Sequence, residues 1–385
     1  MDKFKDIRPY HDGEIRPVID KLIENPEFLA SIASFYAPRM ARLFPAMMRN
    51  VAHNKLKGQL KAVCDVATMQ DVIAVYMDKM IQDTTTGLTH SGIENLQEGK
   101  SYLFISNHRD ITMDPAFVNY ILYHAGYETL QIAIGDNLLK KPFVSDLMRL
   151  NKSFIVKRSL KGRELLLGLT HLSEYIHHCV EDNHNVWIAQ REGRAKDGID
   201  KTDPALLKML AMNQRKIPLS ENLSQLHIVP VSISYEYDAC DVLKAEELYQ
   251  RESTGGFTKT DKSDIESIVA GMIGFKGDVH IAFGKELDFG SDEPELIAAD
   301  IDKQILQNYK LRDSHYLALQ LLQKKGLLSA QEQESLDDNH QVKEASRNVF
   351  EKRLREVDPK LHKHYLFSYA NSLLNKGRTG IKEAS

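Results

Sequence analysis

Residues 102–115 are the most informative part of the sequence and read Tyr102-Leu103-Phe104-Ile105-Ser106-Asn107-His108-Arg109-Asp110-Ile111-Thr112-Met113-Asp114-Pro115. A short apolar run leads into a polar turn and then into a helix-like segment, which predicts a strand-to-helix connection. In such a turn, a histidine held by a carboxylate can take a proton from a hydroxyl near neutral pH. A structural alternative fits the same residues, because Asp114 before Pro115 is a good helix N-cap and His108 is then a loop residue.

The pattern of strand and helix continues on both sides of this turn. Helix-like stretches such as 115–125 and 160–181 separate short apolar runs at residues 102–106, 130–134, 153–157, 185–190, 227–234 and 278–284. Strands that alternate with helices predict an α/β fold, a mixed sheet flanked by helices, with ligands at the strand ends.

Changes in composition divide the chain into three parts. Residues 1–98 form a helical N-terminal region, residues 99–290 the α/β core, and residues 291–385 an exposed helical C-terminal appendage. Polar turns at residues 97–100 and 290–294 mark the two boundaries.

Composition indicates an intracellular globular protein. The chain has 385 residues, 42% of them hydrophobic and 27% charged, with a net charge of -4 that argues against nucleic acid as a partner. The widely spaced Cys64, Cys179 and Cys240 suggest neither a disulfide framework nor a thiolate metal site. The sequence shows no secretory signal and no apolar run of the roughly 18 residues that a spanning helix needs. Any membrane contact is therefore expected at the surface.

One segment has the composition of a membrane-surface helix. Residues 28–64 contain no Asp or Glu, and large apolar side chains alternate there with Arg39, Arg42, Arg49, Lys55, Lys57 and Lys61. Basic charge beside apolar side chains is typical of helices that bind anionic lipid surfaces. The alternative is that these side chains pack a helical subdomain against the core.

Three further segments carry candidate functional residues. Ser153–Arg158 reads as a strand ending in Lys157 and Arg158, cations that suit either a phosphate ligand or the protection of a sheet edge. Residues 191–198 form a charged, glycine-containing turn that read alone is an ordinary solvated loop. Residues 228–236 form a buried-type strand whose Pro230 suits a groove-shaping position or an edge strand.

Together and in this order, these segments resemble the glycerolipid acyltransferase superfamily, over about residues 88 to 290. Its four sequence blocks are matched by Asn107-His108 with Asp114, Ile155-Val156-Lys157-Arg158, Glu192-Gly193-Arg194 and Val229-Pro230-Val231. Two blocks depart from the family pattern. Five residues, not the usual four, separate His108 from Asp114, so either the loop has one extra residue or Asp110 orients the histidine. The third block lacks the residue usually found between its glycine and arginine.

The resemblance implies a role for each matched residue. His108, oriented by Asp114, would act as general base on an acceptor hydroxyl that attacks a thioester directly. Arg158, with Lys157 and Arg194, would hold the acceptor phosphate, and Glu192-Gly193 would help to position the acceptor. No metal is expected, because His171, His177, His178 and His184 lie on or beside what reads as a solvated helix.

The expected function is transfer of a fatty acyl group to lysophosphatidate or glycerol-3-phosphate in phospholipid synthesis. Acyl-CoA or acyl carrier protein would be the co-substrate, with no further cofactor. The resemblance and residues 28–64 together suggest a cytoplasmic protein bound peripherally to the inner face of a membrane. Two alternatives remain, an acyl-thioester hydrolase and a non-catalytic membrane-surface scaffold.

Overall fold

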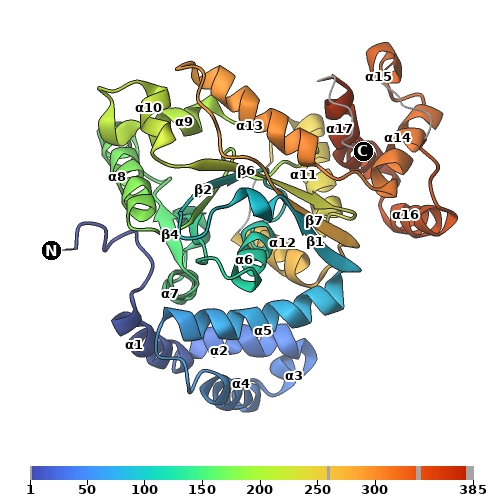
Figure 1. Ribbon diagram of the computed structural model, residues 1–385. Helices are drawn as coiled ribbons and strands as arrows, with labels where there is room; N and C mark the ends of the chain where they lie inside the picture. Colours follow the sequence, from blue (N-terminus) through green and yellow to red (C-terminus); the bar gives the residue numbers. More distant parts are fainter. Residues whose placement is uncertain (1, 258–260, 335–339, 379–385) are drawn as a thin grey trace. The chain divides into compact units, whose positions relative to one another are not determined.

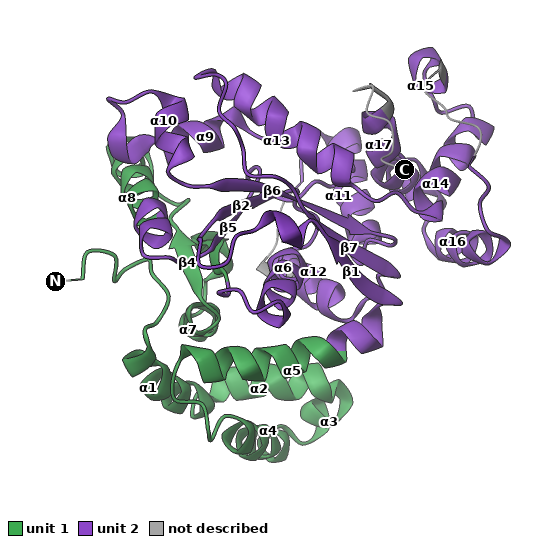
Figure 2. Cartoon of the chain, viewed as in Figure 1, with its two compact units in different colours: residues 1–79, 130–175 green, residues 80–129, 176–385 purple. Residues whose placement is uncertain are grey.

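The computed structural model of the protein describes residues 2–257, 261–334 and 340–378. The chain forms two compact units, which Figure 2 shows in different colours. Unit 1 comprises residues 1–79 and 130–175, and unit 2 comprises residues 80–129 and 176–385. The units therefore divide the chain at points other than the predicted boundaries at 98/99 and 290/291.

Unit 1 is mainly helical and holds two strands. Its elements are α1 (Asp12–Ile23), α2 (Pro26–Tyr36), α3 (Pro38–Leu43), α4 (Pro45–Gln59), most of α5 (Val66–Thr84), β3 (Gln131–Gly135), α7 (Pro142–Leu150), β4 (Ser153–Val156) and most of α8 (Gly162–Glu181). Strands β3 and β4 pair in parallel. The Asn25 side chain accepts from the N–H groups of Glu27 and Phe28, and this cap starts α2. An apolar core holds α1, α2 and α7 together through side chains that include Ile15, Ile19, Phe28 and Phe143.

Unit 2 contains a mixed sheet. Its strands are β1 (Gly87–Ser91), β2 (Leu103–Ser106), β5 (Val186–Ala189), β6 (Ile228–Tyr235) and β7 (Asp278–Phe283), in the order β1-β7-β6-β2-β5. All neighbours in this unit are parallel except β6 and β7, which are antiparallel. The mixed α/β class predicted from the alternating sequence is confirmed.

The helices of unit 2 cover both faces of these strands (Figure 1). Helices α9 (Pro204–Leu210) and α13 (Pro294–Asn308) lie on one side, and α6 (Met113–His124) and α12 (Asp261–Ile273) lie on the other. The remaining helices are α10 (Leu219–Ser224), α11 (Asp241–Thr254), α14 (Asp313–Lys324), α15 (Ala330–Glu334), α16 (Glu344–Glu356) and α17 (His362–Arg378).

Strand β1 lies within residues 1–98, which the sequence predicts to be mainly helical. It pairs in parallel with β7, from Gly87 opposite Asp278 to Ser91 opposite Ala282. Its last three residues, Thr89 to Ser91, are polar in sequence, and its only large apolar side chain is Leu88. A five-residue edge strand of this composition lacks the apolar run by which the other strands are recognised.

Strand β6 is a central strand although it contains Pro230. It lies between β2 and β7, so the interpretation as an edge strand is wrong. The Pro230 carbonyl accepts from the N–H of Gly284, which follows the last residue of β7. Pro230 therefore lies opposite Gly284, just beyond the end of the β6–β7 ladder, and its missing N–H costs at most the one bond that would return to Gly284.

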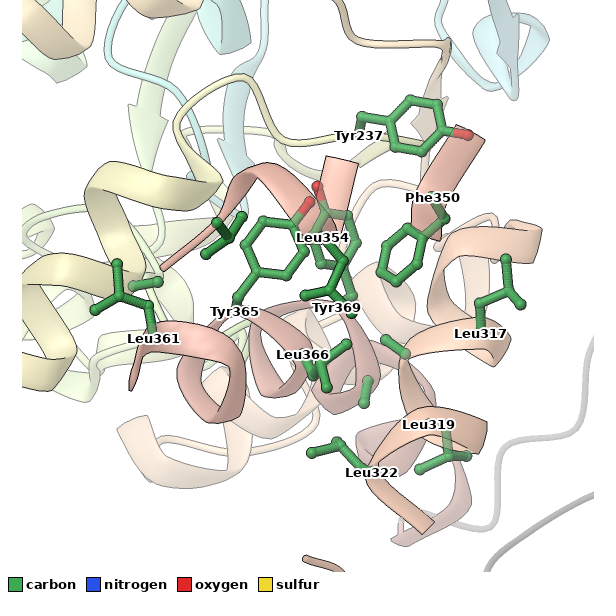
Figure 3. Close-up of a cluster of buried hydrophobic side chains, with 14 of the residues drawn as sticks. Tyr237, Leu317, Leu319, Leu322, Phe350, Leu354, Leu361, Tyr365, Leu366 and Tyr369 are labelled. Carbon is green, nitrogen blue, oxygen red and sulfur yellow. The ribbon is translucent and has the colours of Figure 1, made fainter. Parts of the chain in front are cut away.

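The C-terminal helices are packed into unit 2 and do not form the exposed appendage that the sequence suggested. Helix α13 buries Ile297, Ile301 and Ile305 among its apolar residues. Helices α14, α16 and α17 share an apolar cluster that includes Phe350, Tyr365 and Tyr369 (Figure 3). Residues 335–339 and 379–385 of the predicted appendage lie outside the described residues. Burial of these aromatic rings makes the C-terminal helices part of the core.

Among the described residues, no helix is both long enough and apolar enough to cross a bilayer.

Candidate active site

The turn after β2 is built by the polar residues that follow the strand. The Asn107 side chain accepts from the Ile233 N–H at 2.8 Å and donates to the Ile233 carbonyl at 2.9 Å, which fastens the turn to β6. Helix α6 begins at Met113, so Asp114 lies in its first turn and is not the N-cap. The carboxylate of Asp110 takes the capping role, because its Oδ1 accepts from the N–H groups of Thr112 and Met113.

His108 and Asp114 form a hydrogen-bonded pair. The His108 Nδ1 lies 2.8 Å from Asp114 Oδ2, and the Asp114 side chain is fully buried while that of His108 is 14% exposed. Trp187 packs edge-on against the imidazole at 5.7 Å between ring centroids, and its indole N–H donates to Ser106. A carboxylate at Nδ1 favours the tautomer in which Nε2 is free of its proton and can act as a base.

Both oxygens of the Asp114 carboxylate accept hydrogen bonds. Besides His108, its Oδ2 accepts from the backbone N–H of Arg109 at 2.6 Å and of Asp110 at 2.9 Å. Its Oδ1 accepts from the Tyr235 hydroxyl at 2.7 Å. Since a buried carboxylate is costly without such partners, these bonds hold it in one orientation. Tyr235 was not predicted as a member of this group, because β6 is remote from the turn along the chain.

Asp110 lies behind the turn and makes no hydrogen bond with His108. It is 4% exposed, and burial, together with the nearby Asp114 charge, raises the pKa of its carboxyl above the ordinary value of 3.8. A Cβ added to Gly271 of α12 would lie 2.1 Å from Asp110 Oδ2. Only glycine at this position therefore lets α12 approach the turn so closely.

The Gly271→Ala variant should lower the free energy of unfolding by about 1–3 kcal/mol, because the new methyl group displaces the buried Asp110 carboxylate. Gly58→Ala in α4 is the matched control, since a Cβ there meets no atom within 4 Å. That control should be neutral or slightly stabilising, as alanine is the better helix former. Urea denaturation of both variants measures the difference, and equal stabilities would contradict the close packing of α12 on Asp110.

Arg109 ties the turn after β2 to α17. Its Nη2 donates to Asp200 Oδ2 at 2.6 Å, to the Gly198 carbonyl at 3.2 Å and to the Ser372 hydroxyl at 3.2 Å. Burial disfavours the charge of Arg109, but the Asp200 carboxylate outweighs that effect and raises the pKa of the guanidinium. This buried ion pair was missed in the sequence, because Asp200 and Ser372 are remote from the turn along the chain.

The backbone just after the third block is hydrogen-bonded to the backbone of His108. The Ala195 N–H donates to the His108 carbonyl at 2.8 Å. Glu192 and Gly193 form the exposed tip of the turn, and Gly193 has a φ of +77°, which favours glycine. Glu192 and Gly193 are therefore open to solvent, and their proposed role in positioning the acceptor stays a prediction.

The Arg194 side chain turns toward α12. Its Nη2 donates to the Ser267 hydroxyl at 3.2 Å, and its Nη1 is buried without a hydrogen-bond partner among the described residues. A buried guanidinium nitrogen without a protein acceptor can still bind one from a ligand or water. Arg194 therefore remains a candidate phosphate ligand.

Lys157 and Arg158 follow β4 in unit 1. Lys157 Nζ lies 2.5 Å from Asp6 Oδ2 in an ion pair. The Arg158 N–H donates to Asp136 Oδ1 at 3.1 Å, and its side chain passes over Gly135, where a Cβ would lie 2.9 Å from Arg158 Nε. These contacts are internal to unit 1, and the phosphate-binding role of both cations stays a prediction. No group of three or more potential metal ligands occurs among the described residues.

Comparison with known proteins gives three kinds of match. Residues 87–234 match the family model described as Acyltransferase. Glycerol-3-phosphate acyltransferase of Alteromonas mediterranea is 27% identical over 230 residues, which cover 56% of this chain and 27% of that protein. The enzyme of the same name from Haemophilus ducreyi is 24% identical over 281 residues, 72% of this chain and 33% of that protein. The 1-acyl-sn-glycerophosphate (LPA) acyltransferase PlsC from Thermotoga maritima is a solved structure with 12% identity and a TM-score of 0.35, covering 77% of this chain and all of that one.

The site and the fold together define an α/β domain with a histidine–carboxylate pair at the end of a parallel strand. The match over residues 87–234 contains the pair, the third block and most of β6. Residues 87–234 are similar to the Acyltransferase family, which confirms the resemblance inferred from the sequence blocks. The chain spans about a third or less of the length of the curated relatives that it matches.

Proposed function

We propose that this protein is an O-acyltransferase that moves a fatty acyl group from a thioester to a hydroxyl of glycerol-3-phosphate or lysophosphatidate. The buried hydrogen bond between Asp114 and His108, inside a domain of the acyltransferase family, carries the proposal. The names of the relatives favour these two acceptors. The donor is acyl-CoA or acyl carrier protein, and phospholipid synthesis is the process that uses the product.

The proposed mechanism needs one proton transfer in each direction. His108 Nε2 takes the proton of the acceptor hydroxyl as its oxygen attacks the thioester carbonyl. The carbon–sulfur bond then breaks, and the thiolate receives the proton from the imidazolium, whose charge Asp114 stabilises. No acyl-enzyme forms, and the scheme uses no metal or further cofactor. Arg158, with Lys157 and Arg194, is proposed to hold the acceptor phosphate, while Glu192 and Gly193 position the glycerol.

Thiol release from an acyl thioester tests the reaction class. Purified protein is given acyl-CoA or acyl carrier protein, with and without glycerol-3-phosphate or lysophosphatidate. Release that requires an acceptor, together with formation of the acylated product, supports the transferase. Equal release without an acceptor identifies a hydrolase, and no release with any pair of substrates favours the scaffold.

We further propose that unit 1 binds the inner, cytoplasmic face of a membrane. Large apolar side chains are exposed on the end of α2 and on α3 and α4, namely Phe35, Tyr36, Met40, Leu43, Phe44, Met47 and Val51, each between 37% and 68% exposed. We call these seven residues the α2–α4 patch. Arg39, Arg42 and Arg49 are exposed in the same segment, which contains no acidic residue. Unit 1 has 20 Lys and Arg against 14 Asp and Glu although the whole chain is acidic. This combination suits an anionic lipid surface.

The Leu43→Glu variant should bind anionic liposomes about tenfold more weakly, or worse. Leu43 is 68% exposed. Burial of a leucine side chain in the membrane stabilises the bound state by about 1.5–3 kcal/mol, and the glutamate variant loses this contribution. Val75→Glu is the matched control, because Val75 on α5 of unit 1 is also 68% exposed but lies outside the α2–α4 patch. Co-sedimentation with liposomes measures both. Equal weakening in the two variants would show that the patch has no special part in binding.

A further inference from the structure

The Tyr235 hydroxyl is a buried donor that the proposed mechanism does not yet use. Tyr235 is the last residue of β6 and is 6% exposed. Its ring packs on Phe117 of α6 with 6.1 Å between centroids, and its hydroxyl donates to Asp114 Oδ1 at 2.7 Å. The residue therefore joins the central strand of unit 2 to the carboxylate that binds His108.

The contacts of Asp114 divide between its two oxygens. Oδ2 receives the two backbone N–H groups and His108, whereas the hydrogen bond that the structure records at Oδ1 comes from Tyr235. Bonds at both oxygens prevent rotation of the carboxylate about its Cβ–Cγ bond. Without the hydroxyl, a fully buried Oδ1 loses its donor, and the carboxylate turns or shifts to regain one.

The hydroxyl stays a donor throughout the working pH range. Burial, the charge of Asp114 and that of Asp110 raise the pKa of Tyr235 well above its ordinary value of 10. A phenol that remains protonated can stabilise a carboxylate without competing for its charge. The Asp238 charge acts on Tyr235 in the same direction, and Arg109, Tyr309, His315 and Tyr369 line the same small cavity as Tyr235.

We propose that Tyr235 is a positioning residue of the acyl transfer, because its hydroxyl keeps the Asp114 carboxylate turned toward His108 Nδ1. The inference rests on the proposed function. Tyr235 touches neither substrate in this scheme and acts only through Asp114. Its loss should therefore slow the chemical step and leave substrate binding unchanged.

The Tyr235→Phe variant tests the proposal, because phenylalanine keeps the ring contact with Phe117 and removes only the hydroxyl. We expect kcat to fall between about 10- and 100-fold, the worth of one hydrogen bond to a charged group, with both KM values within twofold of wild type. The acid limb of the pH–rate profile should move to lower pH, since a carboxylate that has turned from Nδ1 stabilises the imidazolium less. A Tyr235→Phe enzyme with wild-type kcat and pH profile would overturn the proposal.

Tyr237→Phe is the matched control. Tyr237 lies two residues farther along the chain, is also buried, and packs in the C-terminal cluster of Figure 3, away from Asp114. It should keep wild-type kcat, and an equal loss in both variants would contradict a specific role for Tyr235. Because the Asp110 charge interacts with both Asp114 and Tyr235, the pH profiles are repeated with Asp110→Asn in the background. A shift that disappears there would assign the limb to Asp110 and overturn the proposal.

Two safeguards separate this proposal from the proposed function. Wild-type protein that turns over no acceptor contradicts the function, whereas wild-type turnover with an unaffected Tyr235→Phe contradicts only the positioning role. The downfield NMR resonance of the His108 Nδ1 proton, identified by its loss in His108→Ala, should move in Tyr235→Phe and stay in place in Tyr237→Phe, whatever the activity. If Tyr235→Phe does not fold, Tyr235→Met, which also lacks the donor, replaces it in both measurements.

Discussion

The His108→Ala variant should transfer acyl groups to an acceptor about 10²- to 10⁴-fold more slowly than wild type, the usual contribution of a positioned general base. The structure gives this residue no other evident task, because its side chain contacts the Asp114 carboxylate and the edge of Trp187. Its removal should leave the fold intact at a cost of about 1–2 kcal/mol. Both KM values should stay near those of wild type, since no binding group is lost.

Initial rates of acceptor-dependent thiol release measure this effect, with unfolding curves recorded on the same samples. His184→Ala is the control, because His184 lies in unit 2, is 45% exposed on its side chain and pairs with Glu128 at the surface. It should retain wild-type rates. A His108→Ala enzyme that is folded and fully active would remove the histidine from the mechanism and direct attention to another base.

Local pattern was enough to predict most of the strands. The apolar runs at residues 102–106, 153–157 and 227–234 correspond to β2, β4 and β6. Short runs of consecutive apolar side chains are typical of strands that are buried on both faces. Strand β1 was missed for the converse reason, since an edge strand can be polar. The central position of Pro230 in the sheet was not predicted either. It depends on where β7 ends, and the local sequence around Pro230 does not indicate that end.

The sequence predicts the histidine–carboxylate pair and favours Asp114 as the partner of His108, because Asp114 lies at the predicted helix start. The spacing keeps Asp110 as the alternative. The choice depends on where α6 begins, and the structure starts the helix at Met113, with Asp110 bonded to its first N–H groups and Asp114 facing the imidazole. Boundaries of helices are the part of a sequence interpretation that is least determined by local pattern.

Contacts between remote segments were beyond the sequence. Arg109 directly follows the histidine in the sequence, and the structure buries it against Asp200 and α17. The C-terminal helices looked like an appendage because they are rich in charge, yet their apolar faces meet in one cluster. The amphipathic pattern of a helix indicates that its apolar face is covered, but it does not identify the segment that covers it.

The Asp114→Asn variant should lower kcat about 100-fold while preserving the geometry of the turn. Two backbone N–H groups, of Arg109 and Asp110, donate to Oδ2, so the amide oxygen must occupy that place and its NH₂ group must face Tyr235. His108 then keeps an acceptor at Nδ1 but loses the negative charge that stabilises the imidazolium, which is worth about 1.5–3 kcal/mol. The acid limb of the pH–rate profile should move to lower pH, because the imidazolium loses its counter-charge.

The Asp110→Asn variant should keep its activity, unlike Asp114→Asn. The comparison therefore shows which of the two carboxylates orients His108. The amide oxygen of the Asp110→Asn variant can still accept from Thr112 and Met113, so activity should stay within a few fold of wild type. Burial raises the pKa of Asp110, so the wild-type fold binds this proton more tightly than the unfolded chain and loses stability as pH rises from about 4 through the raised pKa. The variant lacks that penalty and should gain stability relative to wild type at pH 7, with the gain shrinking toward pH 4. A 100-fold loss of kcat in Asp110→Asn, with Asp114→Asn fully active, would assign the orienting role to Asp110 and require the turn to rearrange when substrate binds.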